Sequence, residues 1–366
     1  MGQSRAFSRR EFARWAASVG VVTEAALAQR SMPGGPPPPD AVMINANENP
    51  LGPCAEALEA MAGALKRGGR YSFFEPMELR RLMSEQEGVG LDHVQVFAGS
   101  SDPLHRVVLA FCGPGRSYVT ADPAYESGDG PAEFRGAAIH RVPLTKEYAH
   151  DVREMLKRAG EAAGVFYVCN PNNPTGTLTP REEIEYLVAN KPAGSVVLVD
   201  EAYIHFSGAQ SCVDMVAAGK DVVVLKTFSK IYGMAGLRSG VAMGRPDLLA
   251  KIAPYATMFL PCTGLAGAIA SLKAKGVVAE RRRYLKEVRE DVFSWMTGEG
   301  YRFVPSVSNK FMVDVGRPGR EVMAAMAKEK VYIGRSWPSW PQHVRVSIGT
   351  REEMELFKGA FARVMG

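Results

Sequence analysis

Three short, uncharged apolar runs constrain the fold of this chain more than any other feature of its sequence. They occupy residues 165–169, 196–199 and 222–225, and each contains several valines or other strongly apolar side chains. Strands this apolar are buried on both faces, which is typical of a parallel or mixed sheet between layers of helices. Amphipathic patterns that predict helices alternate with these runs, at residues 102–111, 149–159 and 180–189. The sequence therefore predicts an α/β fold with a large, mostly parallel sheet.

The pattern changes after a long helical segment at residues 277–296. Short strand patterns follow, separated by helical patterns near residues 320–328 and 351–364; the strands are expected at 301–304, 310–315, 331–333 and 344–348. They predict a smaller α+β C-terminal domain. We expect the large domain at residues 42–265, with its N-terminal segment contributing to the small domain, and the small domain at residues 266–366. The basic cluster at 281–283 is expected to face solvent.

Composition excludes several functional classes. Hydrophobic residues make up 46% and charged residues 23% of the 366 residues, which indicates a globular chain. The net charge of +5 is too small for a nucleic-acid-binding protein. The five cysteines show no C-x-x-C spacing, so no metal site is expected.

The first residues resemble an export signal. Residues 8–14, Ser-Arg-Arg-Glu-Phe-Ala-Arg, are similar to the twin-arginine motif, and a mostly apolar stretch follows and ends in Ala-Leu-Ala at 26–28. We therefore predict a signal peptide at residues 1–28, a periplasmic or exported protein, and no membrane anchor after cleavage. The alternative is a basic extension on a cytoplasmic enzyme. Residues 29–41 are rich in proline and glycine and predict an extended linker.

Four polar segments follow apolar strands, where open α/β sheets place their ligands. They occupy residues 98–102, 170–176, 200–203 and 226–230, and Arg238 follows the last of them. Taken alone, each has an ordinary alternative: a capped helix start, a turn, a salt bridge and a surface lysine. Taken together, they offer an amine for a Schiff base, a carboxylate for a pyridine nitrogen, and serine, arginine and a helix N-terminus for a phosphate. Those are the groups that pyridoxal 5'-phosphate needs.

These segments resemble the class I/II aminotransferases, which are fold type I pyridoxal-phosphate enzymes. The matching motifs are Asn-Pro-Asn-Asn-Pro-Thr-Gly at 170–176, Asp-Glu-Ala-Tyr at 200–203, Thr-Phe-Ser-Lys at 227–230 and Ala-Gly-Leu-Arg-Ser-Gly at 235–240. Residues 47–53 and 344–350 match as well, and the most similar branch is that of histidinol-phosphate aminotransferase. The resemblance implies ping-pong transfer of an amino group from an amino acid or a histidinol-phosphate-like amine to a 2-oxo acid.

The resemblance also implies a role for each matching residue. Lys230 would form the Schiff base with the cofactor and later act as the base, and Asp200 would pair with the ring nitrogen; these two and Tyr203 are the predicted catalytic residues. The remaining cofactor contacts would come from Asn173 and Tyr203 at the ring hydroxyl, Tyr125 stacked on the ring, and Ser100, Ser101, Ser229 and Arg238 at the phosphate.

On the substrate side, Arg345 would bind an anionic group of the substrate, and Asn47 is a further candidate. Tyr71 lies where the family supplies a tyrosine from the neighbouring subunit, so a homodimer is implied. Residues 334–341, Gly-Arg-Ser-Trp-Pro-Ser-Trp-Pro, depart from the family pattern. Arg335 is our candidate for the family's second arginine, and the two tryptophans indicate either an altered pocket or domain packing.

Two other functions fit the same motifs. A decarboxylase of the threonine-phosphate type, a racemase or a lyase would share the fold, because the bond that is cleaved depends on how the substrate is oriented over the ring. A non-enzymatic pyridoxal-phosphate-binding protein is the second alternative. Joint presence of Lys230, Asp200 and Arg345 favours an enzyme.

Overall fold

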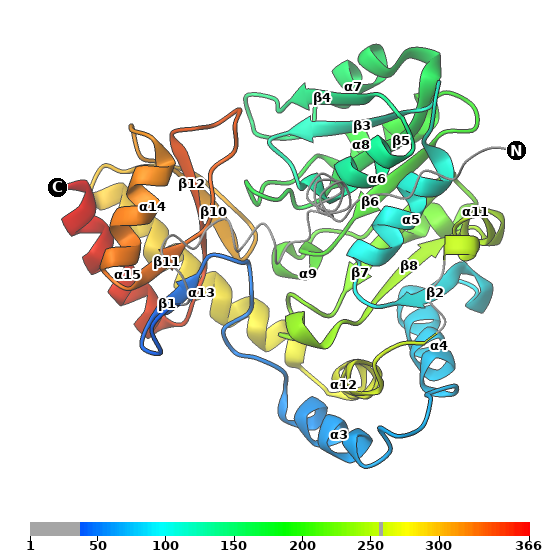
Figure 1. Ribbon diagram of the computed structural model, residues 1–366, viewed down its shortest axis with the longest axis horizontal. Coiled ribbons are helices and arrows are strands. Elements are labelled where there is room, and N and C mark those ends of the chain that lie inside the picture. Colours follow the sequence, from blue (N-terminus) through cyan, green and yellow to red (C-terminus); the bar gives the residue numbers. More distant parts are fainter. Residues whose placement is uncertain (1–36, 256–258) are drawn as a thin grey trace, which may run out of the picture.

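The computed structural model describes residues 37–255 and 259–366, which form a larger and a smaller part (Figure 1). The predicted signal peptide at 1–28 lies outside the described residues, as does most of the linker expected at 29–41. Within the described residues, no helix has the length and apolar character needed to span a membrane.

A seven-stranded sheet forms the centre of the larger part, on the right in Figure 1. Its strand order is β2-β8-β7-β6-β5-β3-β4, and all strands are parallel except β8. The bounds are β2 (Val94–Phe97), β3 (Ser117–Asp122), β4 (Ile139–Pro143), β5 (Ala163–Cys169), β6 (Val196–Asp200), β7 (Val222–Thr227) and β8 (Gly240–Gly244). Every residue of β5, β6 and β7 is buried, which confirms the mostly parallel, helix-enclosed sheet. Since these three neighbours are parallel, their C-terminal ends meet at one edge of the sheet.

Helices pack against the strands of this sheet. Those in contact with its strands include α5 on β5 and β6, α7 on β3 and β4, α8 on β6, and α10 on β7 and β8. The helices of this part are α3 (Ala55–Leu65), α4 (Glu75–Glu87), α5 (Ser101–Phe111), α6 (Asp129–Phe134), α7 (Val152–Ala159), α8 (Arg181–Asn190), α9 (Ile204–Ser207), α10 (Val213–Ala217), α11 (Pro246–Ile252) and α12 (Cys262–Lys273). The domain boundary expected at residue 265 falls inside α12, which packs on α3 and α4.

The smaller part, on the left in Figure 1, combines three helices with short strands. β9 (Arg302–Val304), β10 (Lys310–Asp314) and β12 (His343–Ser347) form an antiparallel sheet in the order β12-β10-β9. The helices are α13 (Val277–Gly298), α14 (Gly319–Lys328) and α15 (Arg351–Met365). β1 (Val42–Ile44) pairs in parallel with β11 (Val331–Ile333), so the N-terminal segment is part of this domain.

The prediction that residues 281–283 face solvent is wrong for two of the three arginines. Arg281 is buried and donates a hydrogen bond to the Ile231 carbonyl at 2.9 Å, and Arg282 donates to the His205 carbonyl. Successive residues of a helix point about 100° apart, so three adjacent arginines cannot share one face. α13 therefore turns part of this basic cluster toward the large domain.

Candidate active site

A cavity at the C-terminal ends of β5, β6 and β7 gathers every residue that the sequence assigned to the cofactor. It is lined by Ser100, Ser101, Tyr125, Cys169, Asn173, Asp200, Ala202, Tyr203, Thr227, Ser229, Lys230 and Arg238. Cys169, Ala202 and Thr227 were not predicted, although each is next to or within a motif that was. These residues lie at or after the C-terminal ends of five strands, β2, β3, β5, β6 and β7, which the sheet brings together at one edge.

One end of the cavity is built to hold an anion. Arg238 donates hydrogen bonds to the Ser229 hydroxyl at 3.2 Å and to the Ala98 carbonyl at 3.2 Å. Helix α5 begins at Ser101, and the Ser100 side chain makes no capping hydrogen bond, so the first backbone N–H groups of α5 are available to a ligand. Gly99 has φ +86°, and a Cβ there would overlap the Arg238 guanidinium. The combination of arginine, hydroxyls and helix N-terminus is typical of a phosphate site.

A buried carboxylate lies at the end of β6. Asp200 is 3% exposed, and its Oδ2 accepts a hydrogen bond from the Tyr167 hydroxyl at 3.0 Å. Its Oδ1 accepts one from the Ala202 backbone N–H, also at 3.0 Å. Burial raises the pKa of the Tyr167 phenol well above its ordinary value, so the hydroxyl keeps its proton and can donate. Asp200 is thus held in one orientation.

Tyr167 is a supporting residue that our sequence reasoning missed. Cys169 is the register partner of Asp200, and Tyr167 is two residues earlier on β5. Alternate residues of a strand share a face, so this alternation was the signal that could have identified it.

Lys230 is positioned by the tight segment that follows β7. Thr227 Oγ1 donates to the Ser229 hydroxyl at 2.9 Å and accepts from the Ser229 backbone N–H at 3.1 Å. Lys230 itself is 4% exposed, and its Nζ lies 5.6 Å from the centre of the Tyr203 ring. The amine therefore faces a water-poor cavity rather than bulk solvent.

A hydrogen-bonded network closes the side of the cavity that faces the small domain. Asn47 Nδ2 donates to Asn173 Oδ1 at 3.2 Å and to the Tyr203 hydroxyl at 3.1 Å. Arg345 Nη1 donates to the same Asn173 oxygen at 2.9 Å, and its Nη2 donates to the Asn45 carbonyl at 2.7 Å. The network therefore brings the predicted substrate residues Asn47 and Arg345 next to the predicted cofactor residues.

Arg335 does not line this cavity. It forms an ion pair with Glu126 and lies over the Trp337 ring, with 3.9 Å from the guanidinium carbon to the ring centre. Trp337 is 1% exposed and donates a hydrogen bond to the Ala124 carbonyl of the large domain at 3.0 Å. Trp337 thus packs between the two domains, as the packing interpretation expected.

Tyr71 also lies away from the cavity of its own chain. It is 69% exposed and stacks on Phe259, with the ring centres 4.1 Å apart. Its position on the surface leaves it able to contact a second molecule.

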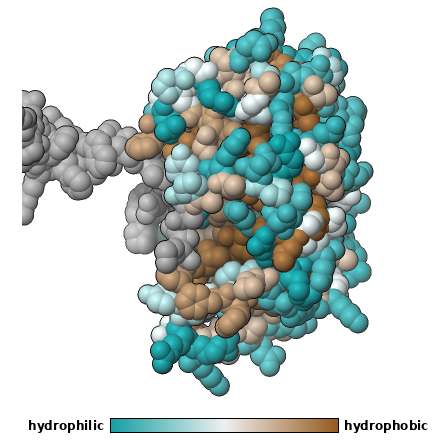
Figure 2. Space-filling model, turned by 90° about the vertical axis from the view of Figure 1, so that its right-hand side faces the viewer, coloured by the Kyte–Doolittle hydropathy of each residue, from teal (hydrophilic) through white to brown (hydrophobic). Residues whose placement is uncertain are grey.

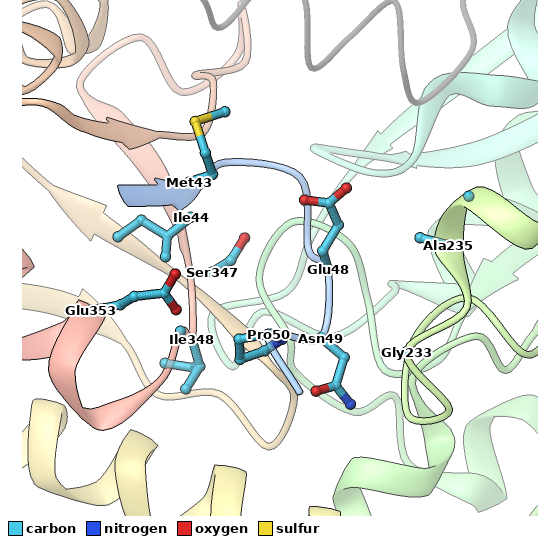
Figure 3. A pocket seen from close by; sticks show the side chains of 12 residues that line it. Met43, Ile44, Glu48, Asn49, Pro50, Gly233, Ala235, Ser347, Ile348 and Glu353 are labelled. Carbon is cyan, nitrogen blue, oxygen red and sulfur yellow. The ribbon is translucent and has the colours of Figure 1, made fainter. Parts of the chain in front are cut away.

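A second pocket lies beside the first, between the N-terminal segment and the two domains (Figure 3). Its lining includes Glu48, Asn49, Ser347 and Glu353. Glu353 is occupied with capping α15, where it accepts a hydrogen bond from the Thr350 backbone N–H at 2.7 Å. Of the described residues that line this pocket, none is basic, so the strand-end cavity is the one suited to a phosphate and a Schiff base.

The strand-end cavity fits pyridoxal phosphate on its own chemistry. It offers an anion site at Arg238 and the start of α5, a buried carboxylate at Asp200, an aromatic ring at Tyr125, and a buried amine at Lys230. The space left by Gly99 is where a larger residue would displace Arg238. Fold and site together define an α/β enzyme of the Schiff-base-forming, pyridoxal-phosphate-dependent class.

Comparison with known proteins agrees with this class. Residues 39–361 match the family model described as aminotransferase class I and II. The chain is 33% identical to the aromatic amino acid aminotransferase of Cutibacterium acnes over 318 residues, 86% of this chain and 90% of that protein. It is also 33% identical to histidinol-phosphate aminotransferase 2 of Pseudomonas fluorescens over 337 residues, 90% of each chain.

A solved structure gives the same result. The putative histidinol-phosphate aminotransferase from Erwinia carotovora atroseptica superposes with a TM-score of 0.85 at 28% identity, over 90% of this chain and 98% of that one. The chain belongs to the class I and II aminotransferase family. It is an aminotransferase, and its cofactor is pyridoxal 5'-phosphate, which the cavity residues fit.

Proposed function

We propose that this aminotransferase moves an amino group from an amino acid or a histidinol-phosphate-like amine to a 2-oxo acid, with Lys230 and Asp200 as its catalytic residues. One observation supports these roles: Lys230, Asp200 and Arg238, which lie in different segments of the chain, line the same cavity. When bound, pyridoxal phosphate supplies an aldehyde that condenses with amines and a ring that accepts an electron pair.

Lys230 is the general base in this proposal. Of the described residues that line the cavity, it alone carries an aliphatic amine. Nζ would take the proton from the α-carbon of the donor and return it to the carbon on the other side of the donor nitrogen, so a single buried base would serve both transfers.

Asp200 and Arg345 orient the reacting groups. Asp200, fixed by Tyr167 and the Ala202 N–H, accepts a hydrogen bond from a protonated ring nitrogen and keeps the proton there. Arg345 is 5% exposed and has a guanidinium suited to a two-pronged contact with a carboxylate. An amino-acid donor and a 2-oxo acid each present a carboxylate to Arg345, and a histidinol-phosphate-like amine would present its phosphate, so one anion-binding residue can serve both halves of a ping-pong reaction.

The absorbance of the bound cofactor tests this proposal. We expect purified protein to show a band that is lost when an effective donor is added and restored by a 2-oxo acid. Lys230→Ala abolishes both changes, whereas Lys220→Ala, at an exposed lysine, leaves them intact. A band that no donor alters, or a Lys230→Ala variant with full turnover, would contradict the proposed roles. Product analysis separates transamination from decarboxylation and racemisation.

We also propose a homodimer in which Tyr71 reaches the neighbouring site. Tyr71, Phe73, Phe74 and Met77 are 69%, 61%, 80% and 66% exposed, and they lie at or just before α4. Figure 2 shows hydrophobic side chains gathered on the side of the molecule that carries this helix. An exposed apolar patch of this kind is typical of an interface.

Complementation tests the shared site. Mixed Lys230→Ala and Tyr71→Ala proteins are expected to regain activity, because a mixed dimer then contains one site with both residues intact. Mixed Lys230→Ala and Asp200→Ala proteins are the matched control, since both residues belong to the same site of one chain. Equal recovery in the two mixtures, or none in either, would remove Tyr71 from the neighbouring site.

Export through the twin-arginine route is a further proposal. It rests on the motif at residues 8–14, and this route suits a cofactor enzyme because it carries folded proteins. Replacing Arg9 and Arg10 by lysine should stop export while leaving activity in cell extracts unchanged. Undiminished recovery of the double variant from the periplasm would contradict export through the twin-arginine route.

A further inference from the structure

A second arginine, Arg335, lies beside the predicted substrate arginine Arg345, although it does not line the strand-end cavity. The backbone N–H of Arg345 donates a hydrogen bond to the Arg335 carbonyl at 3.1 Å, so the two residues lie on adjacent segments of the small domain. Both guanidinium groups approach the Trp337 ring, with their central carbons 3.9 Å (Arg335) and 5.6 Å (Arg345) from its centre. A second guanidinium therefore lies close to the residue that would bind the substrate carboxylate.

The charge of Arg335 is already matched by an acid of the large domain. Arg335 forms an ion pair with Glu126, and the two side chains are 12% and 29% exposed, so both are partly buried. Glu126 directly follows Tyr125, which lines the strand-end cavity. A carboxylate thus occupies the guanidinium of Arg335 next to the site, and the pair adds no net charge there.

Two neighbouring contacts hold this ion pair in place. The segment at 335–339 of the small domain lies against the segment at 122–126 of the large domain, and every second residue makes a contact, in opposite order along the two segments. The contacts are the ion pair of Arg335 with Glu126, the hydrogen bond from Trp337 to the Ala124 carbonyl at 3.0 Å, and the hydrogen bond from the Ser339 hydroxyl to Asp122 at 2.6 Å. The pair is therefore one of three linked contacts between the domains.

Arg345 and Arg335 differ in the groups to which they donate. Arg345 donates to the Asn173 side-chain oxygen and to the Asn45 carbonyl, which carry no charge. A donor whose carboxylate binds Arg345 would bring any second negative charge near Glu126. That charge would compete with Glu126 for Arg335 and would be repelled by the Glu126 carboxylate, and both effects cost binding free energy.

We propose that Glu126 is a specificity-determining residue of this aminotransferase, which cancels the charge of Arg335 and so selects donors that present one negative charge over donors that present two. The favoured donors are amino acids with an uncharged side chain, and the disfavoured donors carry a phosphate or a second carboxylate. The inference rests on the proposed role of Arg345 and narrows the proposed class of donor. A phosphate monoester carries a charge of about −1.5 to −2 near pH 7, so it meets the same repulsion as a dicarboxylate.

The test is the first half-reaction of the loaded holoenzyme, followed by the loss of the cofactor band with phenylalanine, glutamate or histidinol phosphate as the donor. The measured quantity is the rate constant for each doubly charged donor divided by that for phenylalanine. We expect Glu126→Gln to raise both ratios by about tenfold, because glutamine keeps a hydrogen-bond acceptor for Arg335 and removes the repelling charge. Glu133→Gln, at an exposed residue of α6, is the matched control and should leave the ratios unchanged.

Arg335→Gln changes the ratios in the opposite direction. It leaves Glu126 without its cation, so both ratios should fall by about tenfold. The double variant, Glu126→Gln with Arg335→Gln, carries neither charge and should return the ratios to those of the wild type. A merely structural defect would instead accumulate in the double variant and would slow all three donors alike.

Unreactive ligands give a readout besides turnover. Phenylacetate presents one carboxylate and succinate presents two, and calorimetric titration of the holoenzyme should show that Glu126→Gln favours succinate over phenylacetate by about tenfold more than the wild type does. Ratios that Glu126→Gln leaves unchanged, or a wild-type enzyme that reacts faster with glutamate or histidinol phosphate than with phenylalanine, would overturn the inference and leave the proposed function standing. A band that none of the donors alters would overturn both.

Discussion

Gly99→Ala is the most direct test of the anion site, because the structure fixes both the position of the added methyl group and what it meets. The new Cβ would overlap the Arg238 guanidinium, which is the flexible end of a side chain, so the arginine moves and the backbone need not. Arg238 then loses its bonds to the Ser229 hydroxyl and the Ala98 carbonyl. Displacing it also removes a charge-assisted contact to the phosphate, worth about 1.5–3 kcal/mol.

That loss corresponds to cofactor binding weakened by about 10- to 150-fold. The left-handed backbone at residue 99 adds a strain of about 1 kcal/mol to the folded state. Gly115→Ala is the matched control: Gly115 has φ +74° and nothing within 4 Å of an added Cβ, so it carries the same backbone strain without the collision. The assay is fluorescence or absorbance titration of apoenzyme with pyridoxal phosphate, with thermal unfolding alongside. Equal affinities in the two variants would refute the placement of the phosphate beside Arg238.

Three further perturbations follow from the buried charges. Arg345→Ala should raise the KM for carboxylate donors by at least 30-fold, about 2 kcal/mol or more, while cofactor binding stays unchanged in the absorbance titration. Lys226→Met removes the ammonium that lies 3.7 Å from the carboxylate of Glu201, which is 1% exposed. The free energy of unfolding, measured by chemical denaturation, should fall by about 3–5 kcal/mol. A fall of less than about 1 kcal/mol would show that the ion pair is dispensable. Burial lowers the pKa of His150 from 6.5 to about 4, so the unfolded chain binds its proton first and stability is lost as the pH falls from 6.5 to about 4. Denaturation across that range should show the loss, and a flat profile would contradict it.

The cofactor site could be predicted from the sequence because two independent patterns coincide there. Strands β5, β6 and β7 are buried throughout, and the polar residues assigned to the cofactor lie at or just after their C-terminal ends. A carboxylate such as Asp200 directly after a buried strand is costly unless it has a partner, so its position was informative by itself. Local patterns of this kind can be predicted from the sequence, because each one depends only on residues within a short segment.

The surroundings of Lys310 and Arg335 could not be predicted from local sequence patterns. Lys310 lies in a strand whose alternation leaves open whether a charged residue faces solvent or another domain, and only the packing of β10 against the large domain resolves it. Arg335 follows the short strand β11 and was placed by resemblance, yet its partner is Glu126, more than two hundred residues earlier in the chain. β8 was missed because its glycines and small residues give no strong strand pattern. In each case the deciding contact joins distant segments.

Basic residues outnumber acidic residues around the cavity. Of the described residues that line it, Asp200 is the only acid, whereas Lys230 and Arg238 are basic, and the buried Lys310 and Arg345 adjoin it from the small domain. The positive charges of Arg238 and Arg345 are costly to remove from water unless anions pair with them. A phosphate at Arg238 would offset one of them, and a substrate carboxylate at Arg345 would offset the other. Binding of cofactor should therefore stabilise the fold strongly, and binding of a carboxylate substrate should stabilise the contact between the two domains, because Arg345 and Asn173 belong to different ones.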